Sequence, residues 1–132
     1  MTEEKLTRYF KNEVFFQHPV TDFDRSIPFY KKLGLEVSQF SEEQDNYDEI
    51  GIFEFNLPVE GAILSLGKVA KENLKPLDSL AISVTDLVEV ERTLKNQEIS
   101  TNEIVDVPGL LSFLSIKDPD GNEIVFVSDP RV

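Results

Sequence analysis

The chain offers few side chains that could serve as a nucleophile, a general base or a metal ligand. It contains one histidine, His18, and no cysteine, which excludes disulfides, thiolate metal sites and a cysteine nucleophile. His18 shares one face of its predicted strand with Val20, and we expect that face to lie beneath a helix rather than in a cavity. Because titrating roles of histidine depend on a polar partner, we expect His18 to be a satisfied, partly buried residue.

Four acidic residues that could bind a cation lie close together in residues 41–48: Glu42, Glu43, Asp45 and Asp48. Calcium loops place oxygen ligands at alternate positions and end with a bidentate glutamate, and this segment has neither feature. The sequence also has no glycine-rich phosphate loop. We therefore expect residues 41–48 to be a solvated connection, and we predict no catalytic residue and no cofactor.

The charge of the chain restricts its partners. There are 13 Lys and Arg against 25 Asp and Glu, which gives a net charge of −12 at pH 7. Such a surface disfavours nucleic acid and anionic membranes and suits a cationic ligand. No apolar run approaches the ~20 residues that span a bilayer, and the N-terminal residues lack a signal-peptide pattern. We therefore expect a cytoplasmic protein that binds neither nucleic acid nor membrane.

The elements that must position these side chains occur twice. Val20-Thr21-Asp22-Phe23 recurs 64 residues later as Val84-Thr85-Asp86-Leu87, each time with an apolar run before it and a helical pattern after it. A corner repeated at half the chain length predicts two copies of one unit. We expect a single domain over residues 1–132, with modules at about 12–67 and 78–128 and a linker at about 68–77.

In each module, the hydrophobic pattern predicts a strand, a helix and three further strands. The predicted strands are residues 13–20, 35–40, 49–56, 62–66, 79–84, 99–107, 111–117 and 124–127. The first helix is expected to begin near Ser26, because Pro28 cannot donate a backbone hydrogen bond deep inside a helix. Asp86 is expected to cap the second helix. Residues 2–11 predict a short amphipathic helix that packs on the main body.

Three local sequences carry further information. Their residues are Val20 to Ser26 running into Phe29-Tyr30 and Leu33-Gly34-Leu35-Glu36, then Leu80 to Leu87, then Phe113 to Val127 with the turn Asp118-Pro119-Asp120-Gly121-Asn122. In this order they resemble the vicinal-oxygen-chelate superfamily of glyoxalases, bleomycin-resistance proteins and extradiol dioxygenases, over about residues 14–128. The resemblance implies an α+β fold of paired βαβββ modules, with a curved mixed sheet around a cavity, and assembly as a homodimer.

Enzymes of this family hold a divalent metal with His, Glu or Gln side chains from the first and last strand of each module. The resemblance places these positions at Phe15, Leu64 (to within one residue), Ser79 and Val125. Phe, Leu and Val have no lone pair to offer, and a Ser hydroxyl alone is a poor ligand for zinc, nickel or iron. Gln17 and Glu123 are near these positions, but the two side chains do not complete a metal site, so we predict no bound metal.

The leading hypothesis is a member of the family without the metal ligands, which binds or sequesters a small molecule, with a cationic aromatic compound as the best match. The residues expected to line its cavity are Phe15, Gln17, Phe53, Phe55, Ser79, Ala81, Ser83 and Val125. Two alternatives stay open: a metal-dependent lyase or dioxygenase with a divergent site, and a structural or regulatory dimer whose cavity is filled core.

Overall fold

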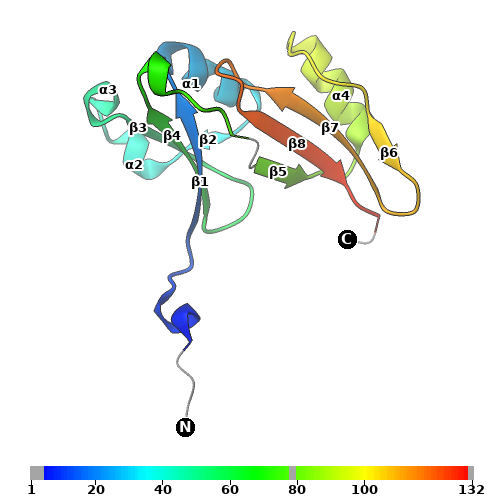
Figure 1. Cartoon of the computed structure of the whole chain (residues 1–132), viewed down its shortest axis with the longest axis horizontal. Helices are drawn as coiled ribbons and strands as arrows, with labels where there is room; N and C mark the ends of the chain where they lie inside the picture. The colour runs from blue at the N-terminus through cyan, green and yellow to red at the C-terminus, as the bar shows by residue number, and fades with distance from the viewer. Residues whose placement is uncertain (1–4, 78–79, 131–132) are drawn as a thin grey trace.

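Two four-stranded sheets, each accompanied by one ten-residue helix, form the body of the protein (Figure 1). The computed structural model describes residues 5–77 and 80–130. After the 3₁₀ turn η1 (Leu6–Tyr9), the first module contains β1 (Val14–Val20), α1 (Phe23–Lys32), β2 (Glu36–Val37), α2 (Gln39–Glu42), α3 (Tyr47–Ile50), β3 (Ile52–Asn56) and β4 (Ala62–Lys68). The 3₁₀ turn η2 (Lys71–Asn73) leads to the second, with β5 (Leu80–Ser83), α4 (Leu87–Asn96), β6 (Val105–Val107), β7 (Leu111–Lys117) and β8 (Glu123–Ser128).

The two sheets have the same topology. Their strand orders are β1-β4-β3-β2 and β5-β8-β7-β6. In each sheet the first strand pairs in parallel with the last, and the other pairs are antiparallel. This arrangement confirms the predicted α+β fold of paired βαβββ modules.

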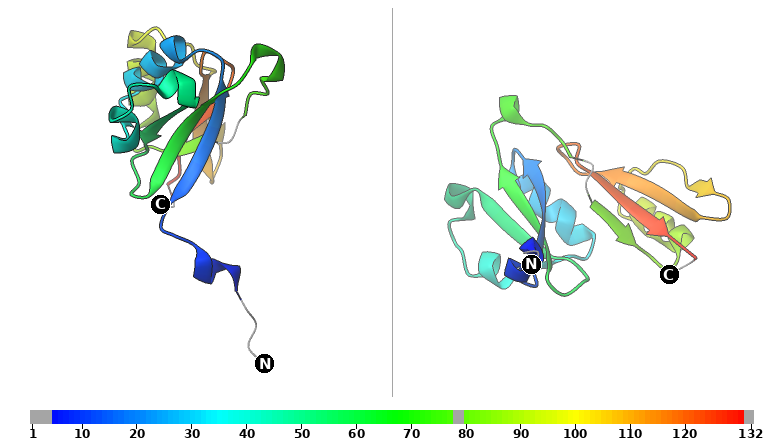
Figure 2. Two further views of the ribbon diagram at one scale, coloured as in Figure 1. Left: turned by 90° about the vertical axis from the view of Figure 1, so that its left-hand side faces the viewer. Right: turned by 60° about the horizontal axis from the view of Figure 1, so that its bottom comes forward.

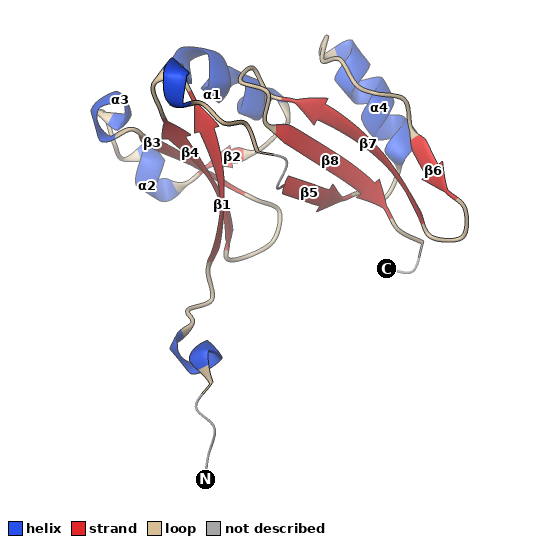
Figure 3. Ribbon diagram, viewed as in Figure 1, coloured by secondary structure: helices blue, strands red, loops and turns tan. Residues whose placement is uncertain are grey.

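The helices lie on one side of the sheets, which leaves the other side open (Figures 2 and 3). Because side chains alternate along a strand, each strand sends every second residue towards the helices. In β1, β3 and β4, the buried residues His18, Phe55 and Leu64 belong to this set. We call the opposite side the open face; it carries the intervening residues, among which Phe15, Gln17 and Glu54 are not buried.

Aromatic residues fill the space between α1 and the first sheet. Tyr30 and Phe55 are fully buried with ring centroids 5.8 Å apart, and Phe53 lies 5.3 Å from Phe55. Phe23 extends the same cluster, with its ring 6.4 Å from that of Phe53. Each such ring removes a large apolar area from water, so this cluster stabilises the contact of α1 with its sheet.

Helix α1 begins earlier than expected. The Asp22 carboxylate accepts a hydrogen bond from the Asp24 amide at 2.9 Å, and the helix starts at Phe23. Pro28 therefore lies inside the helix, which corrects the predicted start near Ser26. The helix tolerates it because Pro28 and Asp24 are both exposed, so water can bond the carbonyl that a proline cannot reach. Gly34 ends the helix with a φ of +89°, in the left-handed position that its sequence predicts.

The segment predicted to be a solvated loop at residues 41–48 contains helical structure instead. Helix α2 is capped by Ser38, whose side chain accepts from the Ser41 amide, and α3 includes Asp48 and Glu49. The strands beside it are correspondingly shorter than predicted, since β2 covers two residues and β3 begins at Ile52. These helices have four residues each, too few for a hydrophobic period to show in the sequence.

The N-terminal arm, which we define as residues 5–11, stands away from the body (Figure 2). Its only helical part is η1, and no residue of η1 is buried. The short N-terminal helix was therefore predicted correctly in kind, but its packing on the main body was wrong. In the part of the chain that the structure describes, no helix is long and apolar enough to span a membrane.

Candidate functional site

The predicted ligand-binding residues lie in three different surroundings. Phe15 and Gln17 point to the open face from β1, and Ala81, Ser83 and Val125 do so from β5 and β8. Ser79 lies outside the described residues. The structure places Phe53 and Phe55 among the buried aromatic residues next to α1, so neither ring is available to a ligand on the open face.

The pairing of β1 with β4 fixes the one metal position of the family that the resemblance gave only to within one residue. Gln17 is paired with Ser65, and at the matching place in the second module Ala81 is paired with Val125. Ser65, not Leu64, is therefore the counterpart of Val125. Leu64 is fully buried on the helix side, because a shift of one residue along a strand exchanges its two faces.

Two rows of side chains cross the open face of the first sheet. One row is polar and consists of Gln17, Ser65 and Glu54, which are successive partners on β1, β4 and β3. The next row contains Phe15 and Ile63, with Asn56 at its end. Side chains of paired residues on one face are within contact distance, so a polar strip lies directly beside an apolar one.

A pocket of about 410 Å³ lies over part of these rows, and we call it the acidic pocket. It is lined by Glu13, Phe15, Ser38, Gln39, Phe40, Ile52, Glu54, Asn56 and Ile63. Two carboxylates and two aromatic rings thus share a pocket whose lining contains no Lys or Arg. Such a combination suits a ligand with a flat apolar part and a positive charge.

The Glu54 carboxyl has an environment that disfavours its charge. Burial is the main cause that raises its pKa above the ordinary value, and the negative charge of Glu13 raises it further. A hydrogen bond from Ser38 offsets part of this effect. A cation bound beside Glu54 would favour the ionised carboxylate and so oppose both contributions.

The sequence did not reveal the role of Glu54, Glu13 and Phe40. They are brought together because α2 folds back on β3: the Ser38 amide donates to the Glu54 carbonyl at 3.0 Å, and the Glu54 amide donates to Ser41 Oγ at 2.8 Å. The only signal that could have pointed to Glu54 was the alternation of Ile52, Phe53, Glu54 and Phe55, which puts Glu54 on the strand face opposite Phe53 and Phe55; both rings were instead predicted to line the cavity.

One neighbouring hollow, of about 400 Å³, continues the open face; it includes Gln17, Ser65 and Ile52, and so adjoins the acidic pocket through Ile52. Another hollow, of about 430 Å³, lies between β1 and β5. It includes Ala81 and Ser83 but also Val14, Phe16 and Leu80, whose side chains belong to the helix side. Four of the predicted residues, namely Phe15, Gln17, Ala81 and Ser83, therefore line three different hollows and are not gathered in one cavity.

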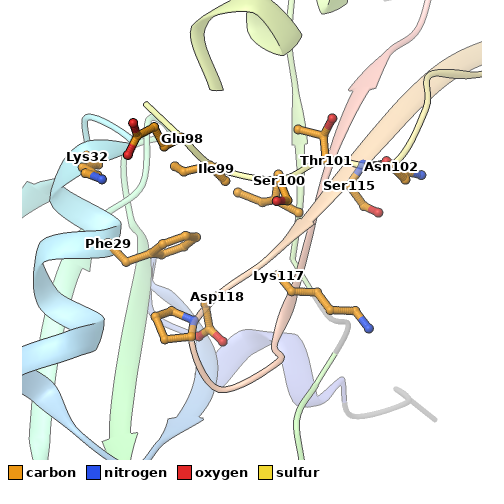
Figure 4. Close-up of a pocket in the computed structure, with 12 residues that line it drawn as sticks. Phe29, Lys32, Glu98, Ile99, Ser100, Thr101, Asn102, Ser115, Lys117 and Asp118 are labelled. Atoms are coloured by element: carbon orange, nitrogen blue, oxygen red, sulfur yellow. Dashed lines mark hydrogen bonds between the residues drawn. The ribbon is translucent and has the colours of Figure 1, made fainter. Parts of the chain in front are cut away.

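A further hollow of about 510 Å³ lies on the helix side of the module junction (Figure 4). The Phe29 ring reaches into it from α1, whereas Lys117 extends away from Phe29 (Figure 4). Its charged residues have mixed signs, with Lys32 and Lys117 against Glu98 and Asp118. It shares no residue with the acidic pocket.

His18 lies in a buried hydrogen-bond chain that joins the two modules. The Tyr30 hydroxyl donates to Asp118 Oδ2 at 2.7 Å, and His18 Nδ1 lies 2.8 Å from the same hydroxyl. Since tyrosine has one proton to donate, His18 must donate from Nδ1 to the Tyr30 oxygen. His18 Nε2 is then the unprotonated nitrogen, and it is buried without a hydrogen-bond partner among the described residues. This geometry fits a structural role for His18.

The hydrogen-bond chain ends at the turn of residues 118–122, which forms a contact between the two modules. Asp118 also accepts hydrogen bonds from the Asp120 and Asn122 amides at 2.9 and 2.8 Å. Asp120 accepts from Thr21 Oγ1 at 2.6 Å and from Arg25 at 3.1 Å. The sequence predicts only a tight turn, but in the structure this turn forms the acidic part of a polar junction between the modules. Each of its two buried carboxylates accepts hydrogen bonds there.

Acid should weaken this junction through His18. Burial is the main cause that lowers the pKa of His18 below its ordinary value of 6.5, and Asp118 opposes the shift. The unfolded chain therefore binds a proton below about pH 6.5 while the folded chain does not, so stability falls as the pH drops from 6.5 towards the folded pKa. The free energy of unfolding, measured by urea unfolding, should therefore rise with pH in this range, and one proton limits the slope to about 1.4 kcal/mol per pH unit. Because His18 is the only histidine, His18→Gln should flatten the curve between pH 6.5 and 5.5; an unchanged slope would contradict the assignment.

Comparison with known proteins agrees with this architecture. The profile of the glyoxalase/bleomycin resistance protein/dioxygenase superfamily matches residues 14–126. The chain belongs to this superfamily. The match runs from the start of β1 into β8, and so includes both modules. No curated protein matches the chain.

Solved structures of the superfamily share the fold at low sequence identity. The antibiotic binding protein TnmS3 from Streptomyces sp. CB03234 is 17% identical, with a TM-score of 0.74 over 92% of this chain and 98% of that one. A glyoxalase/bleomycin resistance protein from Catenulispora acidiphila DSM 44928 is 22% identical, with a TM-score of 0.69 over 89% and 98%. A lactoylglutathione lyase from Agrobacterium tumefaciens is 16% identical, with a TM-score of 0.66 over 86% and 90%. The similarity shows that this superfamily member shares its fold with proteins named for binding and for catalysis.

Proposed function

We propose that this superfamily member binds a small, cationic, partly aromatic molecule on its open face, without the metal of the family's enzymes. The observation that carries the proposal is the acidic pocket, where Glu13 and Glu54 share a lining with Phe15 and Phe40. The Phe15–Ile63 row provides an apolar surface for a flat ring. The adjacent Glu54 provides the negative charge, and Gln17 and Ser65 provide neutral hydrogen-bonding groups.

The donors at the family's metal positions support the part of the proposal that concerns metal. The three positions that the structure describes hold Phe15, Ser65 and Val125. A phenyl ring, a hydroxyl and an isopropyl group do not fit zinc, nickel or iron, which prefer imidazole, thiolate or carboxylate ligands. Among the described residues, no three His, Cys, Asp or Glu side chains are grouped closely enough to hold an ion. We therefore derive no chemical step through a metal.

Calorimetry with a panel of cationic aromatic and glycopeptide drugs tests the proposal. At least one compound should bind, should bind equally well in EDTA, and should be recovered unchanged. Glu54→Gln should weaken it about tenfold or more, because a charge-assisted contact contributes roughly 1.5–3 kcal/mol. Affinity should also fall on acidification at a pH above the ordinary range of a glutamate, because the pKa of Glu54 is raised and only its ionised form attracts the cation.

Glu103→Gln is the matched control, since Glu103 is exposed on the second module and its replacement changes the net charge equally. It should affect only the weak, salt-screened attraction of the whole surface. Equal effects of the two variants would contradict the site. A modified product, or binding that EDTA abolishes, would favour a metal-dependent lyase or dioxygenase. A panel without any binder would favour a dimer whose open face is filled by protein.

A further inference from the structure

In each module, the third strand is held by the chain that precedes it at the same place. In the first module, the Ser38 amide donates to the Glu54 carbonyl at 3.0 Å. In the second, Asn102 stands 64 residues after Ser38, and its amide donates to the Ser115 carbonyl at 3.2 Å. Glu54 and Ser115 have matching places in their sheets, because Glu54 pairs with Ser65 and Ser115 pairs with Val125. The repeat therefore separates the contacts that serve the strand in both modules from those of one module alone.

The return contact, from the strand amide, is made by different side chains in the two modules. In the second module, the Ser115 amide donates to Asn102 Oδ1, so that Asn102 alone makes both contacts with the strand. In the first module, the Glu54 amide donates to Ser41 Oγ at 2.8 Å instead. The side chain of Ser38 therefore takes no part in holding the backbone of β3.

The Ser38 hydroxyl is engaged in another way. Its oxygen caps α2 by accepting from the Ser41 amide at 3.3 Å, and the side chain is buried. A hydroxyl has one proton to donate, and a buried hydroxyl that finds no acceptor is costly. The acceptor is the Glu54 carboxylate, and this hydrogen bond lowers the pKa of Glu54 while burial and Glu13 raise it.

Two neighbouring segments carry further carboxylates. Glu13, in the chain before β1, lines the acidic pocket together with Ser38 and Glu54. Glu42 and Glu43, at the end of α2, are both exposed. Of these three, Glu13 is the one that raises the pKa of Glu54. The Ser38 hydroxyl thus holds a carboxylate that a like charge in the same pocket repels.

We propose that Ser38 is a positioning residue, whose hydroxyl fixes the Glu54 carboxylate in the acidic pocket before any ligand arrives. The division of the strand contacts between the Ser38 backbone and the Ser41 side chain leaves this hydroxyl available. The second module has no such arrangement, since Ser115 has no charge to hold and Asn102 uses its side chain on the strand. The importance of Ser38 for a ligand rests on the proposed function, whereas its hold on Glu54 does not.

The pKa of Glu54 in the ligand-free protein tests this hold. It is measured from the carboxyl carbon chemical shift of Glu54 during an acid titration, and the signal is assigned by its loss in Glu54→Gln. Ser38→Gly should raise the pKa of Glu54, because a hydrogen bond to the ionised form favours that form. Glycine is nearly as good as serine at a helix-capping position, so α2 is retained. Ser38→Thr keeps a hydroxyl and should leave the pKa close to that of the natural chain.

Glu13→Gln provides a comparison of opposite sign. It removes the like charge and should lower the pKa of Glu54, which shows that the titration reports the acidic pocket. A pKa that responds to Glu13→Gln but not to Ser38→Gly would overturn the proposal, because Ser38 would then serve α2 alone. A loss of stability in Ser38→Gly without a change in this pKa has the same meaning.

Binding of the tightest compound of the cationic panel measures the consequence. At neutral pH, Ser38→Gly should weaken binding about threefold to tenfold, because a side chain that is no longer held loses its rotamer freedom on binding. In the Glu54→Gln background, the same substitution should have no further effect, because Ser38 acts through Glu54. Equal losses in both backgrounds would overturn the positioning role. If no compound binds, the proposed function fails, while the pKa of Glu54 still decides the role of Ser38.

Discussion

Phe55→Ala should lower the free energy of unfolding by about 3–5 kcal/mol, whereas Phe15→Ala should change it by less than about 1 kcal/mol. Phe55 is fully buried between Tyr30 and Phe53, so its removal leaves a cavity that the packed rings cannot close. Phe15 is 49% exposed on the open face, and its truncation creates no cavity. Urea unfolding at 25 °C measures both values.

The same two variants should separate stability from binding. Under conditions where both variants are folded, Phe15→Ala should weaken binding of the cationic ligand by an amount on the order of 1–3 kcal/mol. Phe55→Ala should leave the affinity of the folded fraction unchanged, because its ring faces α1. A large loss of stability in Phe15→Ala with no loss of affinity would mean that Phe15 is covered core and would contradict the proposed site.

Tyr30→Phe should destabilise the protein by roughly 2–3 kcal/mol, although it removes only one oxygen atom. The hydroxyl donates to the buried Asp118 carboxylate and accepts from His18, and unsatisfied buried polar groups are costly, most of all next to a charge. Burial, together with Asp118, raises the pKa of Tyr30 far above its ordinary range, so the proton stays on the tyrosine. The loss of stability in Tyr30→Phe should therefore be present across neutral and alkaline pH.

Tyr47→Phe is the matched control for this prediction. Tyr47 is half-buried and packs its ring against Phe23 and Phe53, and the ring contacts survive the change. Its effect should stay within about 0.5 kcal/mol, as for a surface substitution. Similar losses in the two variants would show that the hydrogen-bond chain does not determine the stability of the module junction.

Much of the fold could be predicted because its signals are local and repeated. The two copies of the strand-to-helix corner, at Thr21-Asp22 and Thr85-Asp86, predicted two equivalent modules. The turn at residues 118–122 has a composition that allows few other structures, and β7 has the bounds that the pattern predicted. Alternation along β1 also placed His18 under the helix, where it is 1% exposed.

The parts that escaped prediction depend on contacts between distant residues. Only the pairing of β1 with β4 shows that Ser65, and not Leu64, stands at the metal position, and strand periodicity alone does not specify that pairing. Phe53 and Phe55 were assigned to the cavity because a strand pattern does not say which of its two faces meets α1. The acidic pocket depends on α2, whose Ser38 and Ser41 bond the backbone of Glu54.

Chemical-shift mapping of the backbone amides tests the central claim most directly. The tightest compound of the cationic panel is titrated into isotope-labelled protein at neutral pH, in the presence of EDTA. The largest shifts should cluster on the two rows of the open face, at Gln17, Glu54, Ile63 and Ser65, and they should saturate with the calorimetric affinity. Shifts confined to the helix-side hollow around Phe29 and Lys117, with the open face unchanged, would contradict the account.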